Sequence, residues 1–452
     1  MSSLGFQAVY RAWNAIDGAF CDRAFLPDEA GQVERMLAGR QRLTGFDTGR
    51  PVGEFDLIGV SLAYELELPG LIRCLQLAGL QPLAADRDRR DPPVVLGGPL
   101  SFSNPLPAYP FADVVVLGEA EGVITELLRV WMQCAEKAEL LEAARGLPGV
   151  VVPALDGPRV VPLARAPDQD LPARSAFITP DTELTDMFLI EPERGCHRPC
   201  TYCVMRRPES RDALLAGGGM RLVTPERVLE LVPEQARRVG LVGAAVTDHP
   251  RIKEVIGGLV ESGREIGISS LRADRLDDEL AALLRQGGYR TLTTAADGAS
   301  ERLRKEIRRQ TRAKHLLRAA ELVRDHKFRE LKLYMMLGLP SETDADVDEL
   351  AELSLQLRSV ARVSLSIAPF VSKRNTPLGG LPYAGIKTVE RRITRLKKAL
   401  KGKVKVRPTS ARWAWVEHRL AQAGVEGAQA ALAATAAGGA YGDWKRAFEA
   451  LG

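Results

Sequence analysis

The fold of this chain is decided by the stretch Met187-Phe-Leu-Ile-Glu-Pro-Glu-Arg-Gly-Cys196-His-Arg-Pro-Cys200-Thr-Tyr-Cys203. It begins as an apolar run typical of a strand and then places three of the chain's 6 cysteines in a Cys-x3-Cys-x2-Cys spacing. Thiolates this close in sequence can converge on one soft metal centre, which for sulfur ligands is zinc or an iron-sulfur cluster.

The other cysteines, Cys21, Cys74 and Cys134, lie too far away in sequence to supply an obvious fourth ligand for a closed zinc site. A 4Fe-4S cluster held by three thiolates leaves one iron open to a ligand that is not protein. An iron with an open coordination position indicates a reactive cluster. Two alternatives remain: a zinc knuckle completed by His197, and reduced thiols with a structural role. We expect His197 to be a loop residue.

The Cys196, Cys200 and Cys203 spacing, with the aromatic Tyr202 before the third cysteine, resembles the signature of the radical S-adenosylmethionine (radical SAM) superfamily. This resemblance implies a 4Fe-4S cluster whose open iron binds the amino and carboxylate groups of S-adenosylmethionine. The electron of the cluster would then cleave S-adenosylmethionine to a 5'-deoxyadenosyl radical. The resemblance also implies an electron donor of the flavodoxin or ferredoxin type.

The composition is that of an ordinary globular protein. The chain has 452 residues, a net charge of +4, 27% charged and 45% hydrophobic residues, which predicts two or three domains and does not require a nucleic-acid partner. We expect the basic residues between 391 and 405 to form a solvated helix face. No signal peptide and no apolar run of about 20 residues is evident, and the sparse cysteines favour a cytoplasmic location.

The first part of the chain alternates strand and helix patterns, which predicts an α/β fold. After a lead-in segment over 1–50, residues 51–146 are expected to form a Rossmann-like doubly wound parallel sheet. Its predicted strands and helices cover 55–62, 68–79, 94–99, 112–118 and 123–134. Residues 147–185 are rich in proline and are expected to be a linker.

This first domain resembles the cobalamin-binding domain that precedes the cysteine motif in one radical SAM subgroup. The resemblance places a ligand at the strand ends near Gly97-Gly98-Pro99 and Gly118-Glu119-Ala120-Glu121. The chain has no Asp-x-His-x-x-Gly motif, and no His precedes His197, so no His of this domain can ligate cobalt. A cobalamin-binding domain and a purely structural domain are therefore both open interpretations.

Residues 186–400 are expected to form a partial (β/α)6 barrel of the TIM type. Six strands are predicted, over 187–190, 239–246, 266–272, 289–295, 331–338 and 363–369, each followed by a helix. One of those helices should begin after Thr224 as N-cap with Pro225 at its first position. Ligands are expected at the carboxyl ends of the strands.

The superfamily resemblance also assigns cofactor-binding residues to those strand ends. The segment 293–304 implies contacts to the ribose and carboxylate of S-adenosylmethionine, and the turn 337–343 implies a contact near the adenine. Where the superfamily usually has Gly-Gly-Glu after the second strand, this chain has Ala245-Val246-Thr247-Asp248. The predicted cofactor-binding residues, besides Tyr202, are Thr247, Asp248, Ser270, Arg272, Asp297, Ser300, Arg302, Gly338 and Pro340. We expect His249 to be a turn residue.

The last segment, 401–452, is expected to be a small helical region with three of the chain's 5 Trp residues. We expect its helices to pack across the barrel, and an aromatic wall for a planar substrate is the alternative.

These patterns predict a radical SAM enzyme that functionalises an unactivated position of an unknown substrate. A bound cobalamin would favour methyl transfer to carbon or phosphorus. Sulfur insertion into a tRNA base is a further alternative, disfavoured because the chain shows neither a second cysteine cluster nor an evident C-terminal nucleic-acid-binding barrel. The non-enzymatic alternative is an interaction protein stabilised by a metal at the three cysteines.

Overall fold

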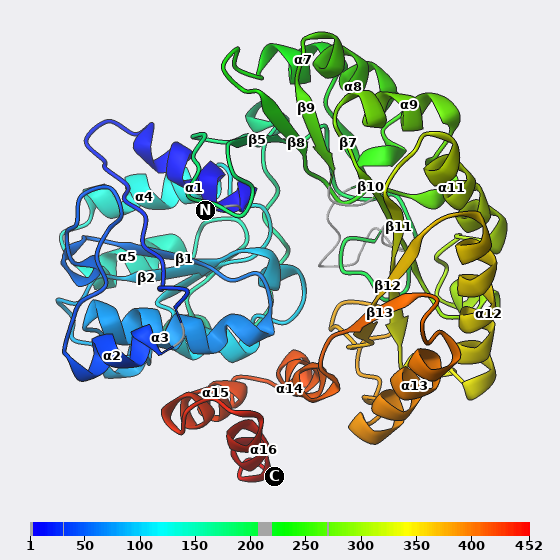
Figure 1. Ribbon diagram of the computed structural model, residues 1–452. Helices are drawn as coiled ribbons and strands as arrows, with labels where there is room; N and C mark the ends of the chain where they lie inside the picture. Colours follow the sequence, from blue (N-terminus) through cyan, green and yellow to red (C-terminus); the bar gives the residue numbers. More distant parts are fainter. Residues whose placement is uncertain (1–2, 30, 207–218, 269–270) are drawn as a thin grey trace.

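A computed structural model describes residues 3–29, 31–206, 219–268 and 271–452. The chain forms two lobes and a group of C-terminal helices (Figure 1). The N-terminal lobe is drawn in blue and cyan, the second lobe runs from green to orange, and the red C-terminal helices lie below the N-terminal lobe.

The N-terminal lobe is built on a four-stranded sheet in the order β1 (Ile58–Ser61), β2 (Val94–Gly97), β3 (Val114–Val116) and β4 (Val150–Val151). The first three strands are parallel, and β4 pairs with β3 in the antiparallel direction. The sheet is accompanied by α1 (Leu4–Asn14), α2 (Gln32–Ala38), α3 (Leu68–Ala78), α4 (Val123–Gln133), α5 (Lys137–Ala144) and α6 (Pro153–Asp156). The short strand β4 lies in the segment that we predicted to be a linker, so this sheet extends beyond residue 146.

Both faces of this sheet are covered, which explains the uninterrupted apolar strands of the sequence. Val94, Leu96 and Val115 belong to a core shared with α3, whereas Val95 and Val114 belong to a core on the opposite face with α4 and α5. The predicted α/β fold with a parallel-dominated sheet is confirmed.

The described residues of the second lobe form seven parallel strands. β5 (Met187–Ile190), β8 (Arg238–Leu241) and β9 (Glu265–Ile268) form one group, and β10 (Thr291–Asp297), β11 (Glu330–Leu337), β12 (Val363–Pro369) and β13 (Lys405–Pro408) form the other. A parallel bridge between Leu271 and Thr294 joins the two groups. The six predicted strands and the partial barrel are confirmed, and β13 is an additional strand that we did not predict.

The helices of this lobe cover the outside of the barrel (Figure 1). They are α7 (Pro225–Glu230), α8 (Ile252–Glu261), α9 (Asp278–Gln286), α10 (Glu301–Glu306), α11 (Ala313–Asp325), α12 (Asp344–Val360) and α13 (Ile386–Ala399). Thr224 is the N-cap of α7 as predicted, because its hydroxyl accepts a hydrogen bond from the backbone N–H of Arg227. On α13, Lys397 and Lys398 are exposed, and Arg391 and Arg395 pair with Asp344 and Asp348 at the surface, as expected of a solvated helix face. Arg392 departs from this prediction, because it is buried and binds Glu342.

The C-terminal helices pack on the N-terminal lobe, which corrects our prediction that they cross the barrel. They are α14 (Ala411–Gln422), α15 (Gly427–Ala436) and α16 (Tyr441–Glu449), and most of their buried apolar residues share one core with α3. Ala411, at the start of α14, belongs to the barrel core. Trp444 is 1% exposed and stacks on Phe448 with a centroid distance of 5.7 Å. The Ala-rich α15 has small side chains that allow close approach, so the tail completes the apolar face of the first sheet.

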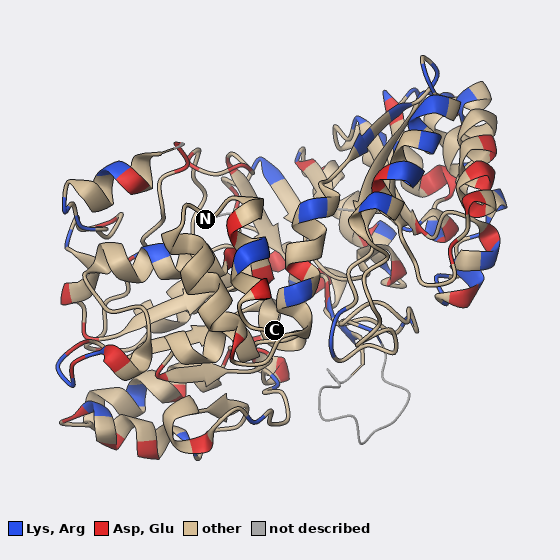
Figure 2. Ribbon diagram, turned by 90° about the horizontal axis from the view of Figure 1, so that it is seen from below, with Lys and Arg blue, Asp and Glu red and all other residues tan. Residues whose placement is uncertain are grey.

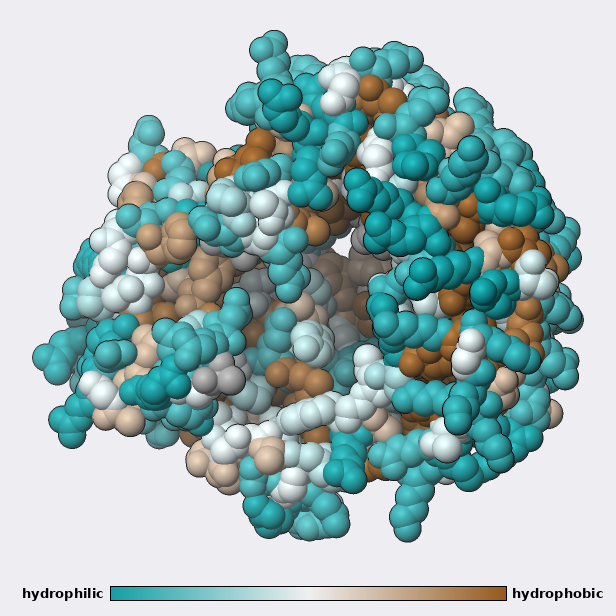
Figure 3. Space-filling view, viewed as in Figure 1, coloured by the Kyte–Doolittle hydropathy of each residue, from teal (hydrophilic) through white to brown (hydrophobic). Residues whose placement is uncertain are grey.

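Acidic and basic residues are interspersed over both lobes (Figure 2). The space-filling view shows a hollow between the N-terminal lobe and the barrel (Figure 3). None of the described helices is long and apolar enough to cross a membrane.

Candidate active site

The cysteine loop starts from a short two-stranded ribbon at the mouth of the barrel. β6 (Glu193–Arg194) pairs in the antiparallel direction with β7 (Arg221–Leu222), and the loop with the three cysteines follows β6. The backbone of Thr201 fixes the loop from two sides, because its N–H donates to the carbonyl of Ile307 at 3.1 Å and its carbonyl accepts from Leu378 N–H at 3.2 Å. The loop is thereby anchored to two distant segments of the barrel lobe.

The three thiols occupy a largely buried region of this loop. Cys200 is 5% exposed, and Cys196 and Cys203 are half-buried. Burial raises the pKa of the Cys203 thiol to about 11, with smaller contributions from the charges of Cys200 and Cys196. Burial likewise raises the pKa of Cys196, and the nearby Cys200 adds to this effect. The pKa values of Cys196 and Cys203 are both raised in part by Cys200, which is consistent with three thiols in one neighbourhood.

Three thiolates on one loop suit a 4Fe-4S cluster with one iron left open, whereas a closed zinc site needs a fourth protein ligand. Sulfur ligands of one zinc ion lie about 3.8 Å apart when each Zn–S bond is about 2.3 Å long. Within the described ranges, no three His, Cys, Asp or Glu side chains are arranged to hold one metal ion. In a 4Fe-4S cluster each thiolate binds a different iron, so the thiolates need a wider spacing.

The two ring nitrogens of His197 have contacts with Met220 and Asp248. Its Nδ1 lies 3.3 Å from the sulfur of Met220, and its Nε2 lies 3.9 Å from Oδ2 of Asp248. A zinc knuckle would need His197 among the cysteine sulfurs, so these contacts disfavour that alternative.

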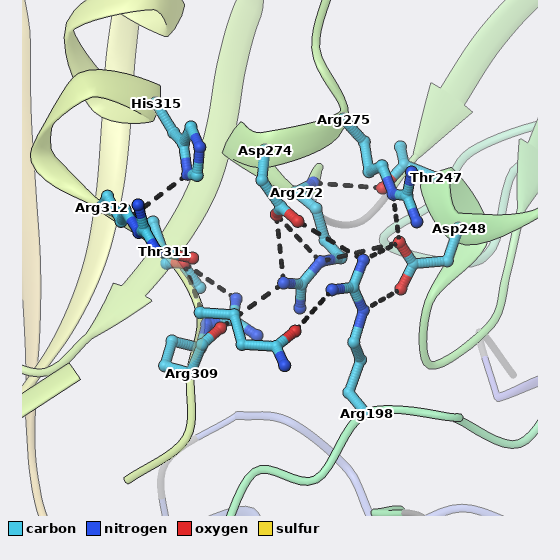
Figure 4. Close-up of polar contacts among 12 residues, drawn as sticks. Arg198, Thr247, Asp248, Arg272, Asp274, Arg275, Arg309, Thr311, Arg312 and His315 are labelled. Carbon is cyan, nitrogen blue, oxygen red and sulfur yellow. Dashed lines mark hydrogen bonds and ion pairs between the residues drawn. The ribbon is translucent and has the colours of Figure 1, made fainter. Parts of the chain in front are cut away.

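Beside the cysteine loop lies a network of arginines and aspartates at the ends of β8 and β9 (Figure 4). The guanidinium of Arg198, between the first two cysteines, binds both oxygens of Asp248, at 2.7 and 2.5 Å. Arg275 donates to the same carboxylate at 3.0 Å, and Arg272 pairs with Asp274 at 3.0 Å. Hydrogen bonds from Arg198 and the charges of Arg272 and Arg198 hold the pKa of Asp248 below its usual value despite burial.

The network explains where several predicted cofactor-binding residues lie. Asp248 has a fully buried side chain and is surrounded by three arginines. The hydroxyl of Thr247 accepts a hydrogen bond from Arg272 N–H at 3.2 Å. Both side chains are therefore held inside the protein network, and their predicted role with S-adenosylmethionine remains a prediction. Ser270 lies outside the described residues.

Asp297 and Tyr202 are brought together as a pair at the carboxyl end of β10. The Tyr202 hydroxyl donates to Oδ2 of Asp297 at 2.5 Å, and Arg309 contacts the same oxygen through Nε at 2.7 Å. Burial and the charge of Asp297 raise the pKa of Tyr202, so its hydroxyl stays protonated. Arg309 was not predicted from sequence, because its basic helical surroundings give no sign that its side chain turns toward the site.

Ser300 and Arg302 point away from this pair and toward α12. The Ser300 hydroxyl caps α10 by accepting from Leu303 N–H at 3.2 Å and donates to Asp346. Arg302 binds the other oxygen of Asp346 at 2.6 Å and is half exposed. In this structure both residues tie α10 to α12, and their predicted contacts to S-adenosylmethionine remain predictions.

Gly338 and Pro340 form the predicted turn after β11. The N–H of Gly338 donates to Oε1 of Glu342 at 2.9 Å, and Arg392 binds the same oxygen at 2.9 Å. The buried pair Glu342–Arg392 fixes this turn at the barrel mouth.

Glu193 is a site residue that we did not predict. It is 0% exposed, and its Oε1 accepts from Ala245 N–H at 2.7 Å, at the turn that follows β8. A Cβ at Gly243 would lie 2.2 Å from this oxygen, so glycine makes room for the carboxylate. The other oxygen, Oε2, is buried and has no hydrogen-bond partner among the described residues. Burial raises the pKa of Glu193 to about 7.

Comparison with known proteins relates both lobes to one superfamily. Residues 5–153 match the family described as "Radical SAM proteins, N-terminal", and residues 190–354 match the "Radical SAM superfamily". The uncharacterized protein MJ0966 of Methanocaldococcus jannaschii is 28% identical over 341 residues, which are 72% of this chain and 68% of that protein.

Two solved structures are similar to part of this chain. SuiB from Streptococcus suis with bound S-adenosylmethionine has 13% identity and a TM-score of 0.37, covering 63% of this chain and 59% of that chain. The cobalamin-dependent radical enzyme OxsB, with aqua-cobalamin and S-adenosylmethionine bound, has 13% identity and a TM-score of 0.49, covering 88% of this chain and 54% of that chain. The chain thus spans a little more than half the length of each.

Proposed function

We propose that this chain, which is a radical SAM superfamily protein with a radical SAM N-terminal domain, cleaves S-adenosylmethionine reductively and uses the product radical on an unactivated substrate position. The observation that carries the proposal is the location of Cys196, Cys200 and Cys203. All three lie on one largely buried loop at the barrel mouth, beside the Tyr202–Asp297 pair.

Cys196, Cys200 and Cys203 would hold a 4Fe-4S cluster. When bound, such a cluster supplies one electron to the sulfonium of S-adenosylmethionine, so that the S–C5' bond breaks to give methionine and a 5'-deoxyadenosyl radical. The electron would come from a small donor protein of the flavodoxin or ferredoxin type. The protein positions the reactants and excludes water.

The Tyr202–Asp297–Arg309 group is suited to bind the ribose. Both the Tyr202 hydroxyl and Arg309 contact Oδ2 of Asp297, which orients the carboxylate. Its second oxygen can then accept hydrogen bonds from vicinal hydroxyls of a nucleoside.

Glu193 is suited to accept from the amino group of S-adenosylmethionine. The turn after β8 lacks an acidic residue at Ala245, and the Glu193 carboxylate lies against this turn from the side of the cysteine loop. Its unpartnered, buried Oε2 needs a hydrogen-bond donor, because an unsatisfied buried acceptor costs about 1–3 kcal/mol. We therefore assign to Glu193 the role that we first considered for Thr247 or Asp248.

Cobalamin-dependent methyl transfer was the outcome expected if the N-terminal domain held a corrinoid. It would require the strand ends of that domain to be open to a large ligand. Ion pairs to the barrel lobe engage those strand ends, so we derive no step through cobalamin.

Anaerobic reconstitution tests the proposal. We expect about four iron and four sulfide per chain and the formation of 5'-deoxyadenosine from S-adenosylmethionine with dithionite. Cys200→Ala should lose this activity, whereas Cys74→Ala, which changes a half-buried cysteine of α3, should keep it. One zinc per chain and no turnover would instead indicate the interaction protein. Copurifying tRNA would favour sulfur insertion.

The role of Glu193 has its own test. Glu193→Gln keeps the shape of the side chain and an acceptor for Ala245 N–H. It replaces an anionic oxygen by an amide, so we expect the dissociation constant for S-adenosylmethionine to rise about tenfold at unchanged iron content. Equal affinity in the two proteins would contradict this assignment.

A further inference from the structure

The carboxyl edge of the N-terminal sheet contacts the barrel and the C-terminal helices at the end of each of its three parallel strands. In sheets of this kind that edge is the usual ligand site. Here ion pairs and a backbone contact engage the end of each of these strands.

After β3, two acidic residues bind two arginines of the cysteine-loop ribbon. Arg194 contacts Glu121 at 2.7 Å and also Glu191 at 2.6 Å, while Glu119 pairs with Arg221. The side chains of these five residues are between 11% and 17% exposed. Arg194 lies two positions before Cys196, so the N-terminal domain holds the start of the cysteine loop.

After β1, Glu65 is 1% exposed and pairs with Lys373, which follows β12. Lys373 also pairs with Glu417 of α14 at 2.8 Å. After β2, the backbone carbonyl of Phe102 accepts from the side chain of Asn375 at 3.3 Å. The loops that follow the strands of one sheet thus contact the loops that follow the strands of the other, and the two carboxyl edges face each other.

The space beside the glycines at these strand ends is occupied by the chain itself. Gly98 has φ +102°, and a Cβ there would lie 2.6 Å from the carbonyl oxygen of Leu62. Gly118 has φ +100°, and a Cβ there would lie 2.4 Å from the carbonyl oxygen of Ala164. Both glycines allow close contact of the backbone with its own neighbours. We expected them to admit a cofactor.

We propose that the carboxyl edge of the N-terminal sheet is a docking face that positions the cysteine loop, and that it does not bind a corrinoid. Glu119 and Glu121 act as positioning residues through Arg221 and Arg194. The positioning role rests on the proposed function, because the cysteine loop that the two arginines hold is the proposed cluster site.

Corrinoid binding is tested on the full-length protein. The protein is incubated with excess hydroxocobalamin, passed through a desalting column and examined for corrin absorbance. We expect less than about a tenth of an equivalent, and a rate of S-adenosylmethionine cleavage that does not respond to hydroxocobalamin. Retention of close to one equivalent would overturn the proposal.

The positioning role is tested with Glu121→Gln and, as a second variant, Glu119→Gln. We expect a loss of about tenfold in the cleavage rate, in line with partners that orient metal ligands. We also expect a changed electron paramagnetic resonance spectrum of the reduced cluster with S-adenosylmethionine, at unchanged iron content. Glu121→Asp should restore part of the rate. The control is Glu126→Gln, whose carboxylate belongs to an exposed pair with Arg129.

Spectra and rates equal to the wild type in both glutamine variants would refute the positioning role. Loss of iron from both variants, with wild-type iron in Glu126→Gln, would support it, because the cysteine loop would then depend on these carboxylates. The iron, sulfide and cleavage activity of the wild type test the proposed function separately.

Discussion

Replacing Glu193 by Gln should remove a pH dependence of stability that its burial creates. The ordinary pKa of a Glu side chain is 4.5, and burial raises that of Glu193 to about 7 in the folded chain. Between these values the folded chain binds more protons at this site than the unfolded chain does. Raising the pH through this window therefore lowers the free energy of unfolding.

The magnitude follows from the same two values. At 1.36 kcal/mol for each pH unit, the interval from 4.5 to about 7 corresponds to roughly 3 kcal/mol. The physical reason is burial of the carboxylate, whose Oε2 has no hydrogen-bond partner among the described residues. Between pH 4.5 and 7.5, the free energy of unfolding of the wild type should thus fall by roughly 3 kcal/mol more than that of Glu193→Gln.

Urea unfolding of the cluster-free, reduced proteins, followed by circular dichroism at several pH values, measures this difference. Glu126→Gln serves as the control, since its carboxylate lies in an exposed pair, and it should run parallel to the wild type. If Glu193→Gln also runs parallel to the wild type, the Glu193 carboxylate is not the source of the dependence and our account of its burial is wrong.

Three further outcomes test the packing and the site. Trp444→Ala removes a side chain that is 1% exposed and should lower the free energy of unfolding by about 3–5 kcal/mol, with faster proteolysis of the C-terminal helices. Gly98→Ala places a Cβ 2.6 Å from a carbonyl oxygen and should cost about 2–4 kcal/mol, whereas Gly49→Ala, with positive φ and open space, should cost about 1 kcal/mol in thermal unfolding. Tyr202→Phe removes the hydroxyl that donates to Asp297 and should weaken binding of S-adenosylmethionine, measured by calorimetry, about fivefold to tenfold.

The sequence alone was sufficient for the features that depend on local patterns. Apolar runs flanked by helical periodicity located β1 to β3 and the six main barrel strands, and β12 has its predicted ends at 363 and 369. The spacing of the three cysteines also predicted a metal-binding loop, and the structure places all three on one largely buried loop.

Other features depend on contacts between distant segments, which no local pattern records. β13 has the sequence Lys-Val-Arg-Pro and becomes a strand because β12 offers it an edge. The C-terminal helices are amphipathic or Ala-rich in a way that suits either lobe, and only the open apolar face beside α3 decides where they pack. Glu193 and Arg309 are charged residues of ordinary appearance in the sequence, and the fold alone buries one and turns the other toward Asp297.

For the same reason, the sequence motif at the strand ends of the N-terminal domain did not reveal which groups contact them. Its glycines and acidic residues after β2 and β3 have the pattern of a ligand-binding edge in sequence. Their partners, however, are distant in sequence. Arg221 lies 102 positions from Glu119, and Lys373 lies 308 positions from Glu65. The positions of the strand ends depend on local sequence. The groups that contact those ends are set by long-range ion pairs and backbone contacts, which form only when both lobes have folded.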